Sequence, residues 1–141
     1  MNVGLPEIDE KVMMPKVIKT LQEIINVPIQ LDSSNVEALE QGLRYYNGRT
    51  IVNSVNGKEE ALDKILPIVK KYGAGLVGLT LDENGIPKTA EGRFEIAKKI
   101  VERAESYGIR RQDIFIDCLS LTVSAPVSYT HLRAHETDQY L

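Results

Sequence analysis

Four short apolar runs recur along the chain, and each of them gives way to small or polar residues. The runs cover residues 29–32, 50–53, 76–80 and 114–117. Each is separated from the next by a stretch long enough for one helix, which is typical of parallel strands joined by crossover helices. Three runs end on Asp32, Asn53 and Asp117. Because the carboxyl ends of such strands open onto one face, we expect these three side chains to converge.

Four segments between and after these runs carry apolar residues at helical spacing. We predict helices over roughly residues 11–25, 36–46, 58–72 and 89–107. Asn35 is the predicted N-cap of the second helix, and Pro67 is expected to bend the third or to remove one hydrogen bond. The apolar positions of the first and last helices are Val17, Ile18, Leu21, Ile24 and Ile25, and Phe94, Ala97, Ile100, Val101 and Ala104.

The order of these elements predicts an α/β fold. The opening Asn2–Gly4 has the look of the end of a further strand, so the chain offers one strand end, four strands and four helices in strict alternation. An eight-stranded β/α barrel needs about 250 residues, so we predict a partial (β/α)8 TIM barrel. Such a fragment leaves two sheet edges unpaired, and we expect it to be unstable in isolation.

The end of the chain breaks this pattern. Residues 127–141 have neither helical nor strand periodicity, and their back-translation resembles one reading frame of a sequencing adapter. We therefore predict one partial barrel domain over residues 1–126, truncated at both ends, and an adapter-derived tail over residues 127–141 that is no domain. His131 and His135 stand four apart in that tail, which is metal-ligand spacing on a helix. In an adapter the spacing has no meaning, and we predict no metal site.

Composition narrows the class of protein. The 141 residues are 43% apolar and 26% charged, with a net charge of -3, which predicts a soluble globular protein without a nucleic-acid partner. No apolar run approaches the roughly 20 residues that span a bilayer, so no membrane partner is expected. Cys118 is the only cysteine; we predict a small buried residue in a reducing compartment, and a cytoplasmic protein.

Five short motifs add a family resemblance. They are Asn2-Val3-Gly4-Leu5-Pro6, Leu31-Asp32-Ser33-Ser34, Val52-Asn53-Ser54-Val55-Asn56-Gly57, Gly78-Leu79-Thr80, and Ile116-Asp117 with Thr122-Val123-Ser124-Ala125. Together they resemble the pterin-binding methyltransferase family, and within it the folate-binding domain of cobalamin-dependent methionine synthases. The resemblance covers residues 1–125 and implies barrel strands two to six.

The resemblance implies a substrate and an acceptor. The intact parent would bind methyltetrahydrofolate and transfer its N5 methyl group to cob(I)alamin on a partner domain or protein. Asp32, Asn53 and Asp117 match family positions that contact the pterin ring, and Asn2 belongs to the matching end of strand two. The asparagine that the family places near N5 falls beyond Pro126. The catalytic residue is therefore unknown, and we expect the fragment itself to be inactive.

These residue types suit a pterin independently of the resemblance. A pterin edge carries amino and amide donors beside acceptors, so Asp32 or Asp117 could accept two parallel hydrogen bonds, and Asn53 suits a mixed edge. From spacing alone, Asp32 and Asn53 are more often turn or capping residues than ligand contacts. Arg93, near the start of its helix, is interpreted as a solvated side chain.

Two other functions stay open. One is a free-standing methyltetrahydrofolate:corrinoid protein methyltransferase, which has no attached cobalamin domain. The other is a non-catalytic pterin-binding or purely structural barrel fragment. No Asp-x-His-x-x-Gly cobalamin motif is present in the sequence to show which corrinoid partner is used.

Overall fold

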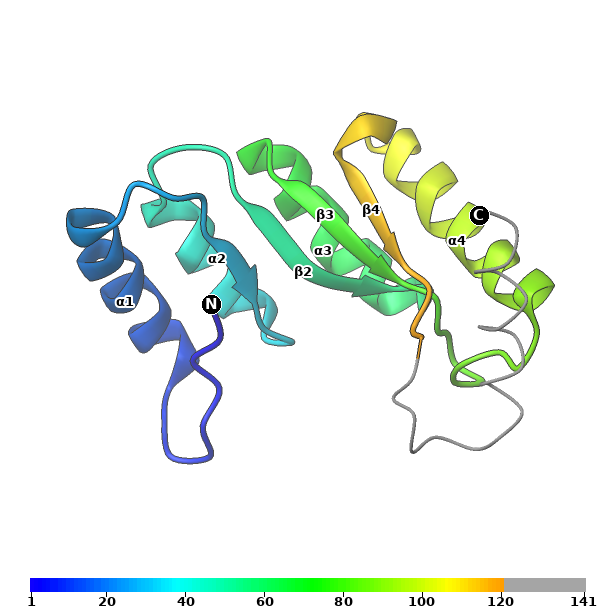
Figure 1. Ribbon diagram of the computed structural model, residues 1–141, viewed down its shortest axis with the longest axis horizontal. Coiled ribbons are helices and arrows are strands. Elements are labelled where there is room, and N and C mark those ends of the chain that lie inside the picture. The colour runs from blue at the N-terminus through cyan, green and yellow to red at the C-terminus, as the bar shows by residue number, and fades with distance from the viewer. Residues whose placement is uncertain (121–141) are drawn as a thin grey trace, which may run out of the picture.

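The computed structural model describes residues 1–120, which form a four-stranded parallel sheet and four long helices. The elements in chain order are α1 (Glu10–Ile24), β1 (Gln30–Asp32), α2 (Val36–Tyr45), β2 (Ile51–Asn56), α3 (Glu59–Tyr72), β3 (Gly75–Leu79), α4 (Ala90–Ser106), the 3-10 turn η1 (Arg111–Asp113) and β4 (Ile114–Asp117). The strands lie side by side in the order β1-β2-β3-β4. The predicted strands, helices and strict alternation are confirmed (Figure 1).

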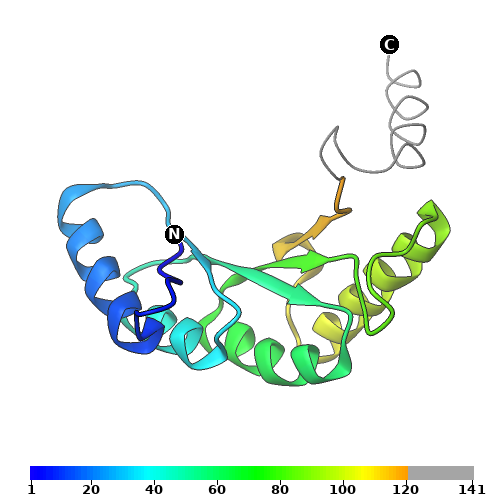
Figure 2. The same ribbon diagram turned by 90° about the horizontal axis from the view of Figure 1, so that it is seen from below.

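All four helices lie on one side of the sheet, as the two views of the ribbon show (Figures 1 and 2). This is the arrangement that successive crossovers of one hand produce. The core fills the layer between the helices and the sheet. Its largest fully buried side chains include Met14, Ile18, Leu31, Leu39, Val52, Val55, Leu62, Leu66, Leu76 and Ile100. Among residues 1–120, no helix covers the other face of the sheet.

Strand β2 contains a one-residue bulge. Asn53 lies opposite Val77 of β3, but Val55 lies opposite Gly78, so Ser54 is an extra residue in β2. The bulge interrupts the usual alternation of faces and places both Val52 and Val55 in the core. The prediction that this strand ends at Asn53 was therefore wrong, because β2 continues past the bulge to Asn56.

The N-terminus lies along the free side of β1. The Met1 amino group donates to the Gln30 carbonyl at 2.6 Å, and the Asp32 amide donates to the Met1 carbonyl at 2.9 Å. These are the two bonds of a parallel ladder, although the predicted strand end at Asn2–Gly4 is not a strand. The reason is that the Asn2 side chain accepts from the Gly4 amide at 2.8 Å and turns the chain.

The predicted apolar positions of α1 and α4 are buried only in part, with Ile18, Ile100 and Ala104 in the core. The buried side of α1 is formed by Met14 and Ile18, whereas Ile24 is 72% exposed. On α4 the buried stripe is Ile96, Ile100 and Ala104, and Phe94 is 66% exposed. α1 packs mainly against α2, and α4 packs against α3 and β3, so these contacts decide which apolar residues of each helix enter the core.

Charged side chains join several elements at the amino ends of the strands. The Asp113 carboxylate accepts from Arg110 Nε at 2.8 Å and forms an ion pair with Arg49, which precedes β2. Arg49 Nε also donates to the carbonyl of Gly73, just after α3, at 2.9 Å. Hydrogen bonds from Arg49 and then Arg110 hold the pKa of Asp113 below its ordinary value of 3.8.

This lowered pKa predicts an acid-sensitive fold. A carboxylate with a depressed folded-state pKa contributes stability above its unfolded pKa of about 3.9, and that stability is lost as the pH falls through the folded-state value. We expect the urea concentration at the unfolding midpoint to decrease when the pH is lowered past about 4. The decrease should be smaller in Asp113→Asn. Glu23→Gln, which removes an exposed carboxylate from α1, should retain the wild-type acid response. An identical response in Asp113→Asn would contradict the role of this carboxylate.

Candidate functional site

The uncovered face of the sheet brings two of the predicted residues together. Asp32 of β1 lies directly opposite Asn53 of β2, and the same row continues to Val77 and Phe115. Adjacent strands are about 4.8 Å apart, so the carboxylate and the amide are neighbours. The predicted convergence is confirmed for this pair.

The side chains of Asp32 and Asn53 take no part in the local hydrogen bonding of residues 1–120. Both are half-buried, and their backbones are fixed, since the Asp32 amide donates to Met1 and the Asn53 carbonyl accepts from the Ser33 amide at 3.1 Å. A cap or turn residue would bond to a neighbouring backbone amide. The two side chains are therefore held in place without acting as caps, and can offer their polar atoms to a ligand.

Residues that follow Asp32 cap helix α2 and fix the chain after β1. Asn35 Oδ1 accepts from the amides of Glu37 and Ala38 at 3.0 and 3.1 Å, so its predicted role as N-cap of α2 is confirmed. The buried Ser33 Oγ accepts from the Asn35 amide at 3.0 Å and donates to the Glu10 carboxylate at the start of α1. This pair of bonds fixes the chain that leaves β1.

Asp117 lies on the same face of the sheet, nearer to the carboxyl ends of the strands than Asp32 and Asn53. It lies opposite Leu79, one row beyond Asn53 and Val77 and on the far strand of the sheet from Asp32. Its Oδ1 accepts from the Leu119 amide at 2.8 Å, so one carboxylate oxygen belongs to a turn. Asp117 is thus on the predicted face, but within residues 1–120 it does not adjoin Asp32.

Asn56 reaches the uncovered face because of the bulge, in the row of Leu79 and Asp117. Its Oδ1 accepts from the Lys58 amide at 3.0 Å, which is a turn bond. Asn2 follows Met1 along the edge of β1, and its Oδ1 is likewise used by the Gly4 amide. For these two residues the structure shows a turn role.

Two residues near β4 differ from their sequence interpretation. Arg93 was expected to be solvated, but it is half-buried and donates from Nε to the Pro87 carbonyl at 3.0 Å and from Nη1 to the Cys118 carbonyl at 2.9 Å. Cys118 was expected to be buried, but it is exposed because it follows the free edge strand β4. These two contacts of Arg93 leave no signal in the sequence, since a backbone carbonyl can come from any residue type.

A hollow of about 420 Å³ adjoins the Asp32 and Asn53 pair. It is lined by both residues and by the loops that follow β1 and β2, with Lys58, Ala61 and Ile65 of the α3 segment on its other side. Its wall combines the Asp32 carboxylate, amides, hydroxyl groups and apolar surface with the charged side chains of Lys58 and the Glu60–Lys64 ion pair. That mixture suits a flat ligand with a polar edge.

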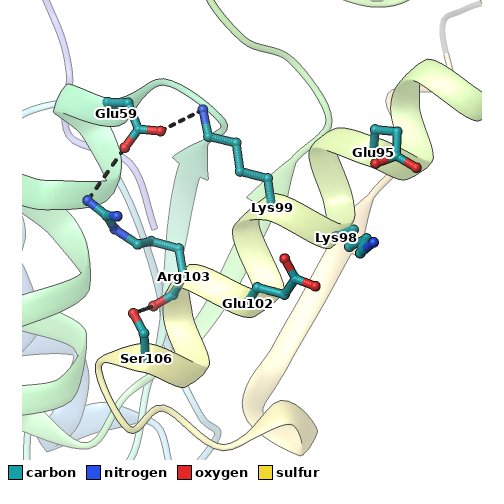
Figure 3. A pocket seen from close by; sticks show the side chains of 7 residues that line it. All are labelled: Glu59, Glu95, Lys98, Lys99, Glu102, Arg103 and Ser106. Atoms are coloured by element: carbon teal, nitrogen blue, oxygen red, sulfur yellow. Dashed lines mark hydrogen bonds and ion pairs between the residues drawn. The ribbon is translucent and has the colours of Figure 1, made fainter.

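A second hollow of about 410 Å³ lies on the outer surface between α3 and α4 (Figure 3). Its charges are paired with one another, because Glu59 contacts Lys99 at 2.9 Å and Arg103 at 3.5 Å. Glu95, Lys98 and Glu102 extend along the surface of α4. This hollow contains none of the predicted site residues, and ion pairs join Glu59 to Lys99 and Arg103 across it.

Residues 1–120 carry neither a metal-ligand cluster nor a membrane-spanning helix. No group of three histidine, cysteine, aspartate or glutamate side chains in this part of the chain could hold a metal ion. None of its helices is long and apolar enough to cross a membrane. His131, His135 and the predicted domain boundary after residue 126 lie outside the described residues.

Comparison with known proteins identifies the family of this chain. The family described as pterin binding enzyme matches residues 3–135. The chain belongs to the pterin-binding enzymes. The match continues past residue 126, and the predicted boundary there stays a prediction.

Relatives among the pterin-binding enzymes and a solved structure agree with this membership. The chain is 36% identical over 110 residues to methionine synthase of Mycobacterium leprae (strain TN), which covers 74% of this chain and 9% of that protein. It is 36% identical over 104 residues to methionine synthase of Mycobacterium tuberculosis (strain ATCC 25618 / H37Rv), covering 70% and 9%. The chain therefore spans about a tenth of the length of these relatives.

One solved structure has a fold similar to that of this chain. The 7,8-dihydropteroate synthase from Vibrio fischeri ES114 superimposes with a TM-score of 0.66 at 11% identity, over 99% of this chain and 52% of that chain. At this identity the likeness shows the fold alone. It confirms the predicted partial (β/α)8 barrel.

The division between caps and candidate ligand contacts predicts separable effects. Asn35→Ala removes the oxygen that accepts from two amides of α2, and should lower the free energy of unfolding by about 1 kcal/mol. Ser34→Ala changes an exposed neighbour in the same loop and should change it by less than about 0.5 kcal/mol. Urea denaturation followed by circular dichroism measures both. Equal stabilities for the two variants would show that Asn35 does not act as a cap in solution.

Proposed function

We propose that the chain supplies the folate-binding part of a methyltransferase of the cobalamin-dependent methionine synthase type. Its substrate is 5-methyltetrahydrofolate, and the methyl acceptor is cob(I)alamin on another domain or protein. The observation that carries the proposal is the pair of Asp32 and Asn53, which lie in register on the uncovered face without side-chain partners in residues 1–120. The single cysteine suits the reducing cytoplasm in which we place the protein.

The pair complements the edge of a reduced pterin. The amino group and the ring N–H next to it are donors, and a carboxylate such as Asp32 can accept from both at once. The Asn53 amide carries one donor and one acceptor, so it suits the neighbouring carbonyl and ring nitrogen without adding charge. Asp117 has one carboxylate oxygen outside its turn and is the third proposed contact. Asn2, at the edge beside β1, is the fourth.

The proposed reaction requires a proton as well as a nucleophile. The cobalt of cob(I)alamin attacks the methyl carbon, the bond from that carbon to N5 breaks, and N5 retains the electron pair. Because a tertiary amine is a poor leaving group, N5 must gain a proton before or during the attack. The products are tetrahydrofolate and methylcobalamin. We assign the groups that bind the pterin to this chain and leave the proton donor without an assignment.

The relatives support this reaction class over its alternatives. Both curated relatives described above are methionine synthases, which favours that activity over a free-standing methyltetrahydrofolate:corrinoid protein methyltransferase. The likeness to dihydropteroate synthase rests on the fold and carries no argument about its reaction.

The proposal predicts a loss of ligand affinity without a loss of fold. Asp32→Asn replaces one accepting oxygen by a donating amide, which would face the donors of the pterin. The affinity for 5-methyltetrahydrofolate should fall about tenfold or more, the cost of one lost charge-assisted hydrogen bond. Asn53→Ala should weaken binding in the same direction. Ligand-observed NMR titration of the full chain measures both affinities.

Asp63→Asn is the matched control for these titrations. It removes an aspartate that pairs with Arg103 at 2.7 Å on the outer surface of the helices, and it should leave folate affinity unchanged. Saturable binding that is insensitive to both Asp32→Asn and Asn53→Ala would sink the site assignment. Methyl transfer is assayed separately, through the visible spectrum of methylcobalamin. This assay uses the longest polypeptide that the source gene encodes when it is read past the codon of Pro126.

A further inference from the structure

The turn after β4 is held by side chains from elsewhere in the chain. The Asp117 carbonyl accepts from both the amide and the hydroxyl of Thr80, each at 3.1 Å, and Thr80 is buried at the end of β3. The next carbonyl, that of Cys118, accepts from Arg93 Nη1 at 2.9 Å. Two consecutive carbonyls are thus fixed by residues 25 or more positions away.

Burial does not hold this turn. The side chains of Asp117 and Cys118 are exposed, and Leu119 has a φ of 54°, in the left-handed region. This conformation is unfavourable for a residue that carries a Cβ. Within the turn the Leu119 amide donates to Asp117 Oδ1 at 2.8 Å, which ties one carboxylate oxygen to the backbone. The carboxylate therefore keeps its orientation only while hydrogen bonds maintain the turn.

Arg93 is suited to maintain it. Nε donates to the Pro87 carbonyl in the loop after β3, while Nη1 donates to the Cys118 carbonyl after β4. A guanidinium is planar and its N–H groups have fixed directions, so two bonds from one group fix the distance between two loops. The arginine itself sits in the first turn of α4, where Thr89 Oγ1 caps the helix by accepting from Gly92 at 3.1 Å.

We propose that Arg93 is a positioning residue for Asp117. It does not touch the ligand in this proposal. By holding the Cys118 carbonyl it fixes the turn in which Leu119 bonds to Asp117 Oδ1, and so directs the other carboxylate oxygen toward the uncovered face. The inference rests on the proposed function in naming a pterin as the ligand of that oxygen, while the clamp on the turn can be tested without any ligand.

The first experiment examines the turn alone. Amide resonances of the ¹⁵N-labelled full chain are compared for wild type, Arg93→Gln, Arg93→Lys and Lys98→Gln. We expect the Leu119 amide to shift in Arg93→Gln and in Arg93→Lys, because a single ammonium cannot reproduce both bonds of the guanidinium. Amides of β1 and β2 should stay in place. Lys98→Gln, which removes an exposed charge from the same helix, should leave Leu119 unchanged.

The second experiment tests whether Arg93 affects ligand binding through Asp117. In a double-mutant cycle, Arg93→Gln should weaken binding of 5-methyltetrahydrofolate about fivefold in the wild-type background, and less than about twofold in Asp117→Ala. A general loss of structure would weaken binding by the same factor in both backgrounds. Thermal unfolding of each variant shows whether the fold is retained.

The outcomes separate the two proposals. An unchanged Leu119 amide in Arg93→Gln, or additive effects of the two substitutions on affinity, overturns the role of Arg93 and leaves the proposed function standing. If the wild-type chain binds no folate, the proposed function fails for this chain, and the Leu119 resonance alone decides whether Arg93 holds the turn. A Leu119 shift together with non-additive affinities supports the inference.

Discussion

The four helices bury one face of the parallel sheet, and this one-sided burial determines which side chains can meet a ligand. Parallel strands joined by crossovers of one hand place every helix on the same side. Apolar residues such as Leu31, Val52 and Leu76 are drawn to that side. Asp32 and Asn53, which alternate with them, are left on the other. The positions of Asp32 and Asn53 on the uncovered face therefore follow from the burial of their neighbours in the core.

The predicted site residues are supported to different degrees. Asp32 and Asn53 are neighbours whose side chains have no structural task within residues 1–120, so a ligand is the simplest account of their arrangement. Asp117, at the end of β4, and Asn2, beside β1, use side-chain oxygens to stabilise turns. A substitution at either of those two would change the backbone as well as any contact with a ligand, and its effect on binding alone would not distinguish the two causes.

Sequence periodicity was sufficient for the elements and their order, because strands and helices bury residues at different intervals. It was not sufficient for the details that depend on contacts distant in sequence. The bulge at Ser54 arises from pairing between β2 and β3, and the phase of α4 is set by its contact with the sheet. The contacts of Arg93 with the Pro87 and Cys118 carbonyls could not be predicted for the same reason, since any residue could supply such a carbonyl.

The bulge in β2 has a consequence for how this segment can vary. Val52 and Val55 both enter the core only because one extra residue stands between Asn53 and Val55. Loss of that residue would restore strict alternation, and every side chain from Val55 to Gly57 would have to exchange faces or shift its pairing with β3. The identity of residue 54 can therefore drift among homologous chains, but we expect the number of residues between Val52 and Gly57 to be fixed, so that insertions and deletions are confined to the loops on either side.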